Sequence, residues 1–133
     1  MELLLGHCDE FVGVELAVEA LASGRGVVVL APHFGAWVYL GMYLLKLPDI
    51  AILYKPPSDP GLEKALLEKR RRGCANPIPA TAPGLRKLYA HLRAGRGAGV
   101  LPDQQPSSGR GRFAPFFGNQ ALTGVLVPRL VQR

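Results

Sequence analysis

One histidine, His33, lies where a buried strand is expected to give way to a helix. Residues 27–31 (VVVLA) are apolar and mostly β-branched, which is typical of a buried strand. Pro32 ends that strand because proline cannot donate to a sheet ladder. Open α/β sheets carry their chemistry at the carboxyl ends of strands, and imidazole side chains suit proton transfer near neutral pH. His33 is therefore a candidate general base, and a structural turn histidine is the alternative.

Four further polar side chains follow expected strands or stand in exposed loops. Asp103 follows the strand expected at 98–101, which makes it either a site residue or a turn carboxylate that caps a local N–H. Lys55 follows another strand and offers a point charge for an anionic group, or it is simply solvated. Arg110 and Arg112 lie in a Gly/Ser loop, where they are free to bind a phosphate or to face solvent.

These residues are positioned by strands that alternate with helices. Asp59 and Thr81 are expected to cap the helices that follow them. The segment 113–118 is apolar, but Pro115 interrupts it, and no strand is expected there. The alternation favours an α/β sandwich with a mostly parallel sheet. Helices are expected at 14–22, 36–46, 60–72 and 83–94 and from 124 onward, and strands at 27–31, 50–54, around 78 and at 98–101.

Length and composition are those of one small globular domain. The chain has 133 residues, of which 48% are hydrophobic and 20% charged, and this excludes a disordered protein. Two cysteines do not make a disulfide framework, so a reducing compartment is expected, and no metal or cofactor site is expected. The charge-free stretch 26–45 is long enough to span a membrane, but Pro32 and Gly35 interrupt it. An interfacial contact through residues 37–44 is the alternative kept open.

The basic side chains are concentrated in the second half of the chain. The net charge is +6, yet residues 1–68 hold four basic and nine acidic side chains, whereas residues 69–133 hold twelve and one. The strongly basic second half of the chain suggests an anionic partner, which could be lipid phosphate, an acidic carrier protein or nucleic acid. A solvated basic surface is the alternative for any single arginine.

Several blocks of sequence together resemble the late acyltransferases of lipid A biosynthesis, the lauroyl and myristoyl type of Gram-negative bacteria. The resemblance begins with Ala-Pro-His-Phe-Gly-x-Trp at 31–37 and Tyr-Lys-Pro-Pro at 54–57. It continues with Gly-x-Leu-Pro-Asp-Gln-Gln at 99–105, Phe-x-Pro-Phe-Phe-Gly at 113–118 and a Thr-Gly helix start at 123–124. Blocks in the same order and at similar spacing cover nearly all of residues 12–131, which makes the resemblance specific.

The resemblance implies a fold and an activity. The expected fold is a three-layer α/β/α sandwich with a mostly parallel sheet, glycerolipid-acyltransferase-like and truncated, and residues 1–133 would form a single partial acyltransferase domain. The implied reaction moves a fatty acyl chain from acyl-acyl carrier protein to a hydroxyl of a lipid A precursor in lipopolysaccharide biosynthesis. The implied location is peripheral, on the cytoplasmic face of the bacterial inner membrane. Exposed sheet edges make self-association an additional expectation.

Two positions depart from the pattern of that family. Its motif has Glu five residues after the histidine, and here that position is Val38; Lys55 stands where the family usually has Arg. Asp103 matches a family Asp near the active site. Loss of the carboxylate that orients a histidine is costly, so we expect impaired transfer unless Asp103 or another group substitutes, and a gain from Glu at position 38. The expected catalytic residues are His33 and Asp103, and the expected substrate contacts are Lys55, Arg110, Arg112 and Trp37.

Two other functions remain open from the sequence. A catalytically impaired relative that binds lipid or carrier protein without turnover would keep His33 and lack the Glu partner. A basic nucleic-acid-binding module would explain the charge of the second half, but no recognition motif accompanies that charge, so no nucleic-acid partner is expected.

Overall fold

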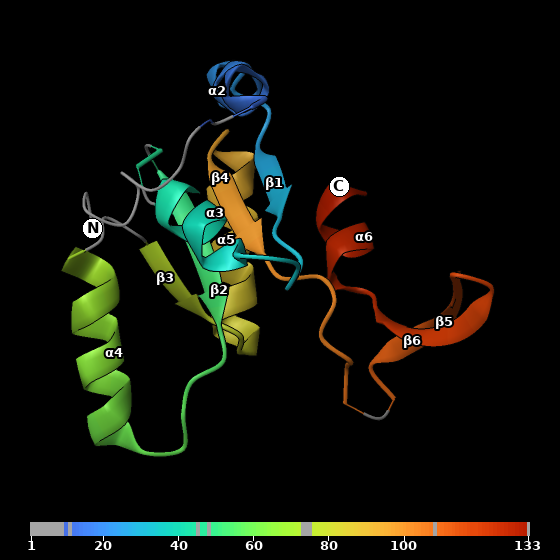
Figure 1. Ribbon diagram of the computed structural model, residues 1–133. Coiled ribbons are helices and arrows are strands. Elements are labelled where there is room, and N and C mark those ends of the chain that lie inside the picture. The colour runs from blue at the N-terminus through green and yellow to red at the C-terminus, as the bar shows by residue number, and fades with distance from the viewer. Residues whose placement is uncertain are drawn as a thin grey trace.

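The computed structural model describes residues 10, 12–44, 46–47, 49–72, 76–107 and 109–132, and helices and strands alternate along most of this chain (Figure 1). Cys8, Cys74 and His7 lie outside the described residues. The helices are α2 (Val14–Ala22), α3 (Trp37–Leu44), α4 (Pro60–Arg72), α5 (Ala82–Arg93) and α6 (Leu126–Val131). The strands are β1 (Val27–Leu30), β2 (Ile50–Tyr54), β3 (Asn76–Pro79), β4 (Gly97–Val100), β5 (Gly111–Phe116) and β6 (Asn119–Gly124).

Four strands form one parallel sheet in the order β1-β4-β2-β3. Of these four strands, β4 comes last in the sequence, yet it lies between β1 and β2 and pairs with both. Its register places Val100 beside Leu30, so β1 and β4 end at the same level. The carboxyl ends of these two strands therefore deliver their following loops to one edge of the sheet.

Apolar side chains cover both faces of this sheet, which makes three layers. Alternate residues of β2 point to opposite faces: Ala51 belongs to a cluster with α5 and α6, and Ile50 to a cluster with α3. Figure 1 shows α3 and α5 on opposite sides of the sheet. The predicted three-layer α/β sandwich with a parallel sheet is confirmed. The buried members of the first cluster are Ala51, Ile78, Leu88, Ala98, Val100 and Leu130, and those of the second are Leu44, Leu47 and Ile50.

Two glycines of β4 allow close packing on the face of the sheet that α3 covers. A Cβ at Gly97 would collide with the Ile50 side chain and lie 2.8 Å from Cδ2 of Leu21, and a Cβ at Gly99 would lie 2.8 Å from Cδ1 of Ile52. Larger residues at these positions would displace α2 and the side chains of Ile50 and Ile52. Glycine at these positions is required by close packing rather than by backbone conformation.

The expected helix caps are present. Asp59 Oδ1 accepts hydrogen bonds from the backbone N–H groups of Gly61 and Leu62 at 2.7 and 3.2 Å, and Thr81 Oγ1 accepts from Gly84 N–H at 3.2 Å. Both caps satisfy donors that have no partner within the helix. His91 is buried on α5, where its Nε2 lies 2.8 Å from the Asp49 carbonyl oxygen and 3.0 Å from that of Gly97. His91 therefore joins the beginnings of β2 and β4, a structural role.

The segment after residue 110 differs from the prediction. Strands β5 and β6 form an antiparallel hairpin, and Pro115 lies within β5, opposite Gln120. Both strands of a two-stranded ribbon are edge strands, so a proline without N–H is tolerated at a position that faces outward. The hairpin stands to one side of the parallel sheet (Figure 1). The expected interruption by Pro115 was therefore wrong.

No helix of the described part of the chain combines the length and hydropathy needed to cross a membrane. The interfacial contact through residues 37–44, kept open as an alternative, remains a prediction. Leu44 is buried, and Tyr43 packs against the cluster on that face of the sheet. The apolar side of α3 therefore faces the protein core at its carboxyl end.

Candidate active site

His33 and Asp103 are bound to each other through two hydrogen bonds. The His33 ring nitrogen Nδ1 lies 2.9 Å from Asp103 Oδ1, and the His33 backbone N–H donates to Asp103 Oδ2 at 2.6 Å. One carboxylate thus fixes both the ring and the loop that carries it. The side chains are 34% and 37% exposed, so the pair is accessible from solvent.

The sheet brings these two residues together although 70 positions separate them. Strands β1 and β4 are parallel neighbours with Leu30 beside Val100, and the Ala31 N–H donates to the Val100 carbonyl at 2.9 Å. His33 and Asp103 each follow three residues after those register partners. Equal offsets from adjacent strand ends place the two side chains face to face.

The electrostatics of the pair favour an ionised carboxylate. The hydrogen bond with the His33 side chain, followed by the one from the His33 backbone N–H, lowers the pKa of Asp103 below its usual value. A carboxylate that accepts from Nδ1–H leaves the proton on that nitrogen, so Nε2 of the neutral ring carries the lone pair. Nε2 has no hydrogen-bond partner among the described residues. His33 is thereby arranged to accept a proton at Nε2.

Trp37 packs against the imidazole. The two ring centroids are 4.7 Å apart, and the planes meet at 67°, an edge-to-face contact. Trp37 opens α3, four residues after His33, so the helix start positions this contact. The expected substrate contact of Trp37 remains a prediction, and what the structure adds is that its indole restrains the His33 ring.

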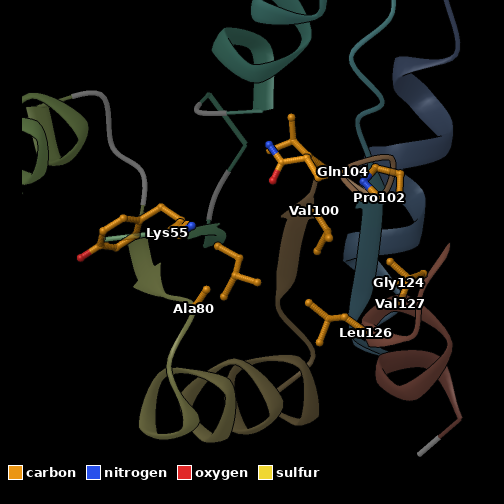
Figure 2. A pocket seen from close by; sticks show the side chains of 11 residues that line it. Lys55, Ala80, Val100, Pro102, Gln104, Gly124, Leu126 and Val127 are labelled. Carbon is orange, nitrogen blue, oxygen red and sulfur yellow. The ribbon is translucent and has the colours of Figure 1, made fainter. Parts of the chain in front are cut away.

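A small cavity lies beside the loop that carries Asp103. It has a volume of about 220 Å³, and Pro102 and Gln104, the neighbours of Asp103 on either side, form part of its wall. Figure 2 shows Lys55 from the loop after β2 and Gln104 from the loop after β4 at this cavity, with Leu126 and Val127 of α6 on another wall. The remaining lining is mostly apolar. Lys55 thus borders a cavity that residues on both sides of Asp103 help to line, although neither His33 nor Asp103 lines it.

A second, larger cavity continues from the first. Its volume is about 710 Å³, and four residues line both cavities: Leu53, Ala80, Gly124 and Leu126. Three arginines border it, namely Arg110, Arg112 and Arg129, beside apolar side chains such as Leu85. Within the described residues no carboxylate pairs with these arginines. The cavity therefore combines unneutralised positive charge with an apolar wall, a combination that fits an amphiphile with an anionic head.

Sequence reasoning missed Arg129 because it lies among the apolar residues of α6. The signal was present in the composition: residues 104–133 contain four arginines and no acidic side chain. The phenylalanines of the hairpin, in contrast, line none of the cavities described here and do not form an acyl pocket. The described residues contain no group of three or more His, Cys, Asp and Glu side chains that could hold a metal ion.

The family was decided by comparison with known proteins. The model of the bacterial lipid A biosynthesis acyltransferase family matches residues 7–133. The chain belongs to this family. A lipid A biosynthesis acyltransferase of Haemophilus influenzae is 26% identical over 116 residues, which cover 86% of this chain and 36% of that protein. The chain thus spans about a third of the length of this curated relative.

In this member of the lipid A biosynthesis acyltransferase family, the carboxylate beside the histidine does not come from the position of the motif's Glu. Val38, at the place where the resemblance expects Glu, is 51% exposed in the first turn of α3 and offers neither charge nor hydrogen bond. Asp103 contacts His33 Nδ1 instead. Asp103 is thus the carboxylate that lies beside the imidazole where the motif's Glu is missing.

Proposed function

We propose that this protein transfers a fatty acyl group from a thioester to a hydroxyl, with His33 as general base and Asp103 as the group that orients it. The observation that carries the proposal is the double hydrogen bond between Asp103 and His33, which leaves Nε2 available. Family membership supplies the reaction class. A bound carboxylate also stabilises the imidazolium that forms during proton transfer.

In the proposed reaction, His33 Nε2 removes the proton of the acceptor hydroxyl while its oxygen attacks the thioester carbonyl carbon. The tetrahedral intermediate then collapses, the C–S bond breaks, and the imidazolium returns its proton to the departing thiolate. The products are an ester and a free thiol, and no redox partner is required. Backbone N–H groups at the start of α3, four residues after His33, are suited to stabilise the oxyanion because the first turn of a helix has unpaired donors.

The two cavities suggest where the acceptor lies. A phosphorylated, acylated acceptor would place its phosphate near Arg110, Arg112 and Arg129 and its reacting hydroxyl toward the small cavity beside Asp103. Lys55 would add a point charge at the junction. We take the acceptor to be a lipid A precursor, the donor to be acyl-acyl carrier protein, and the place of action to be the cytoplasmic face of the inner membrane.

A thioester-release assay tests the proposal. The 133-residue chain is mixed with acyl-acyl carrier protein and a lipid A precursor, and both free carrier thiol and acylated product are measured. Wild-type protein should release thiol only when the acceptor is present, and His33→Ala should lower the rate by about 10²–10⁴-fold, the contribution expected of a general base. Acceptor binding without any turnover by the wild type would instead favour the non-catalytic relative.

A further inference from the structure

The β5–β6 hairpin exposes three phenylalanines. Phe113, Phe116 and Phe117 are 71%, 64% and 88% exposed, and the hairpin stands to one side of the parallel sheet (Figure 1). A two-stranded hairpin is marginally stable in water, and an exposed aromatic cluster at its end adds an unfavourable contact with solvent. Such a hairpin is better suited to a surface that covers its end than to bulk water.

The turn of the hairpin contains a residue that the turn itself disfavours. Phe117 and Gly118 form a two-residue loop, and both have positive φ, 47° and 79°. Two-residue loops of this kind favour Asn, Asp or Gly at both positions, and a bulky residue there is strained. The only ring contact described for Phe117 is the edge-to-face contact with Phe116, with centroids 4.7 Å apart. The unfavourable turn residue therefore presents its ring at the end of the hairpin and does not pack it into the protein interior. Phe116 and Phe117 are called the aromatic tip.

The charges at the other end of the hairpin indicate the chemistry of its partner. Arg110 and Arg112 lie at the base of the hairpin, and no acidic side chain occurs from residue 104 to the end of the chain. Exposed aromatic residues and arginines on one hairpin match the interface of a bilayer, where rings sit at head-group depth and arginines meet anionic lipids. A purely apolar protein groove would leave these arginines without partners.

The position of the hairpin connects the tip to the cavities. Arg110 and Arg112 border the larger cavity, which continues into the one beside Asp103. We infer that the aromatic tip inserts into the head-group region of an anionic membrane and so brings the mouth of the larger cavity to the lipid surface. The choice of a lipid surface rests on the proposed function, because an enzyme that acylates a lipid must reach it there.

Vesicle co-sedimentation tests the inference without any acyl donor or acceptor. The 133-residue chain is mixed with vesicles of phosphatidylcholine alone or of phosphatidylcholine with phosphatidylglycerol, at low and high salt. Wild-type protein should bind the anionic vesicles more tightly, and added salt should weaken binding because it screens the arginines. The double variant F116S/F117N should bind at least about tenfold more weakly, since two rings no longer enter the interface.

Two controls separate membrane contact from loss of fold. Phe117→Asn suits a positive φ, so its thermal midpoint should equal or exceed that of the wild type while its vesicle affinity falls. Leu62→Ser changes an exposed apolar residue on α4, remote from the hairpin, and should bind vesicles as the wild type does. Equal vesicle binding by wild type and F116S/F117N, or no binding by the wild type, would overturn the inference.

A second copy of the chain is the competing occupant. If the tip mediates self-association, sedimentation velocity will show a wild-type dimer that F116S/F117N dissociates, and the membrane inference is then wrong. The proposed function is tested separately: His33→Ala should keep vesicle binding and lose acyl transfer. F116S/F117N should keep acyl transfer to an acceptor dispersed in detergent, because neither ring lines the cavities.

Discussion

Leu30 of β1 lies beside Val100 of β4 in the parallel sheet, and three residues beyond this pair His33 and Asp103 meet. The register of two strands thus creates the contact between an imidazole and a carboxylate. In this family member the contact has a further consequence, because it provides the acidic partner that Val38 does not.

Replacement of Asp103 by Asn should lower kcat by about 10²–10⁴-fold with little change in KM. The two His33 donors contact different oxygens of Asp103, so in the same arrangement an amide presents its oxygen to only one of them and its NH₂ opposes the other. Steady-state acyl transfer at several acceptor concentrations measures both constants. Asp59→Asn is the matched control, because Asn caps α4 as well as Asp does. Equal rates for D103N and the wild type would show that Asp103 does not orient the base.

Glu at position 38 should rescue the Asp103→Asn variant more than it helps the wild type. In the wild type Nδ1 already has a carboxylate partner, so V38E alone should change the rate little. In D103N the ring lacks an anion, and a carboxylate from α3 could restore it. The double-mutant cycle of D103N, V38E and D103N/V38E measures this coupling. Additive effects in the cycle would mean that the two positions do not serve the same histidine.

The pH dependence of stability should report the Asp103–His33 bond. The native pKa of Asp103 is lowered below 3.8, so the unfolded state binds more protons as the pH falls. The contribution of ionised Asp103 is thus fully present above about pH 4 and is lost as the pH falls through its lowered native pKa. Urea unfolding of the wild type and D103N between about pH 2 and pH 6 should give free energies of unfolding that converge at the acid end. A constant difference across this range would contradict the assignment.

Arg129→Gln should raise KM for a phosphorylated acceptor by roughly tenfold and leave kcat nearly unchanged. Loss of one cation from the larger cavity weakens binding of the phosphate in the ground state and the transition state alike. The effect should disappear with an acceptor whose phosphates have been removed. Arg86→Gln, an exposed arginine of α5 that does not line the cavity, serves as control. A similar KM increase for both variants would indicate long-range attraction rather than a site.

Two glycine-to-alanine changes should have opposite effects on the free energy of unfolding. Gly97→Ala adds a methyl group that collides with Ile50 and crowds Leu21, which should cost about 1–3 kcal/mol. Gly41→Ala in α3 adds a methyl group with no neighbour within 4 Å and should stabilise the helix by about 0.5–1 kcal/mol. Urea unfolding at neutral pH measures both. A stable G97A protein would mean that α2 and β4 are less closely packed than described.

The sequence determined the elements whose signals are local. The strand at 50–54 and the helix at 60–72 have the predicted bounds, because apolar spacing, Asp59 and Pro60 act over a few residues. The hairpin was missed for a local reason as well. Its turn has Phe117 at a position where Asn or Gly would have predicted a hairpin turn. Pro115 predicts a break, although proline is tolerated in an edge strand.

The sequence by itself also identified His33, the family resemblance and the loss of Glu at position 38. Only the tertiary structure decided which carboxylate meets the imidazole, because that depends on β4 lying between β1 and β2. Strand order is fixed by how both faces of the sheet bury their side chains, with Gly97 and Gly99 allowing the closest approach. These contacts join residues far apart in the chain, and no local pattern records them. The same reason placed Arg129 beside Arg110 and Arg112 at one cavity.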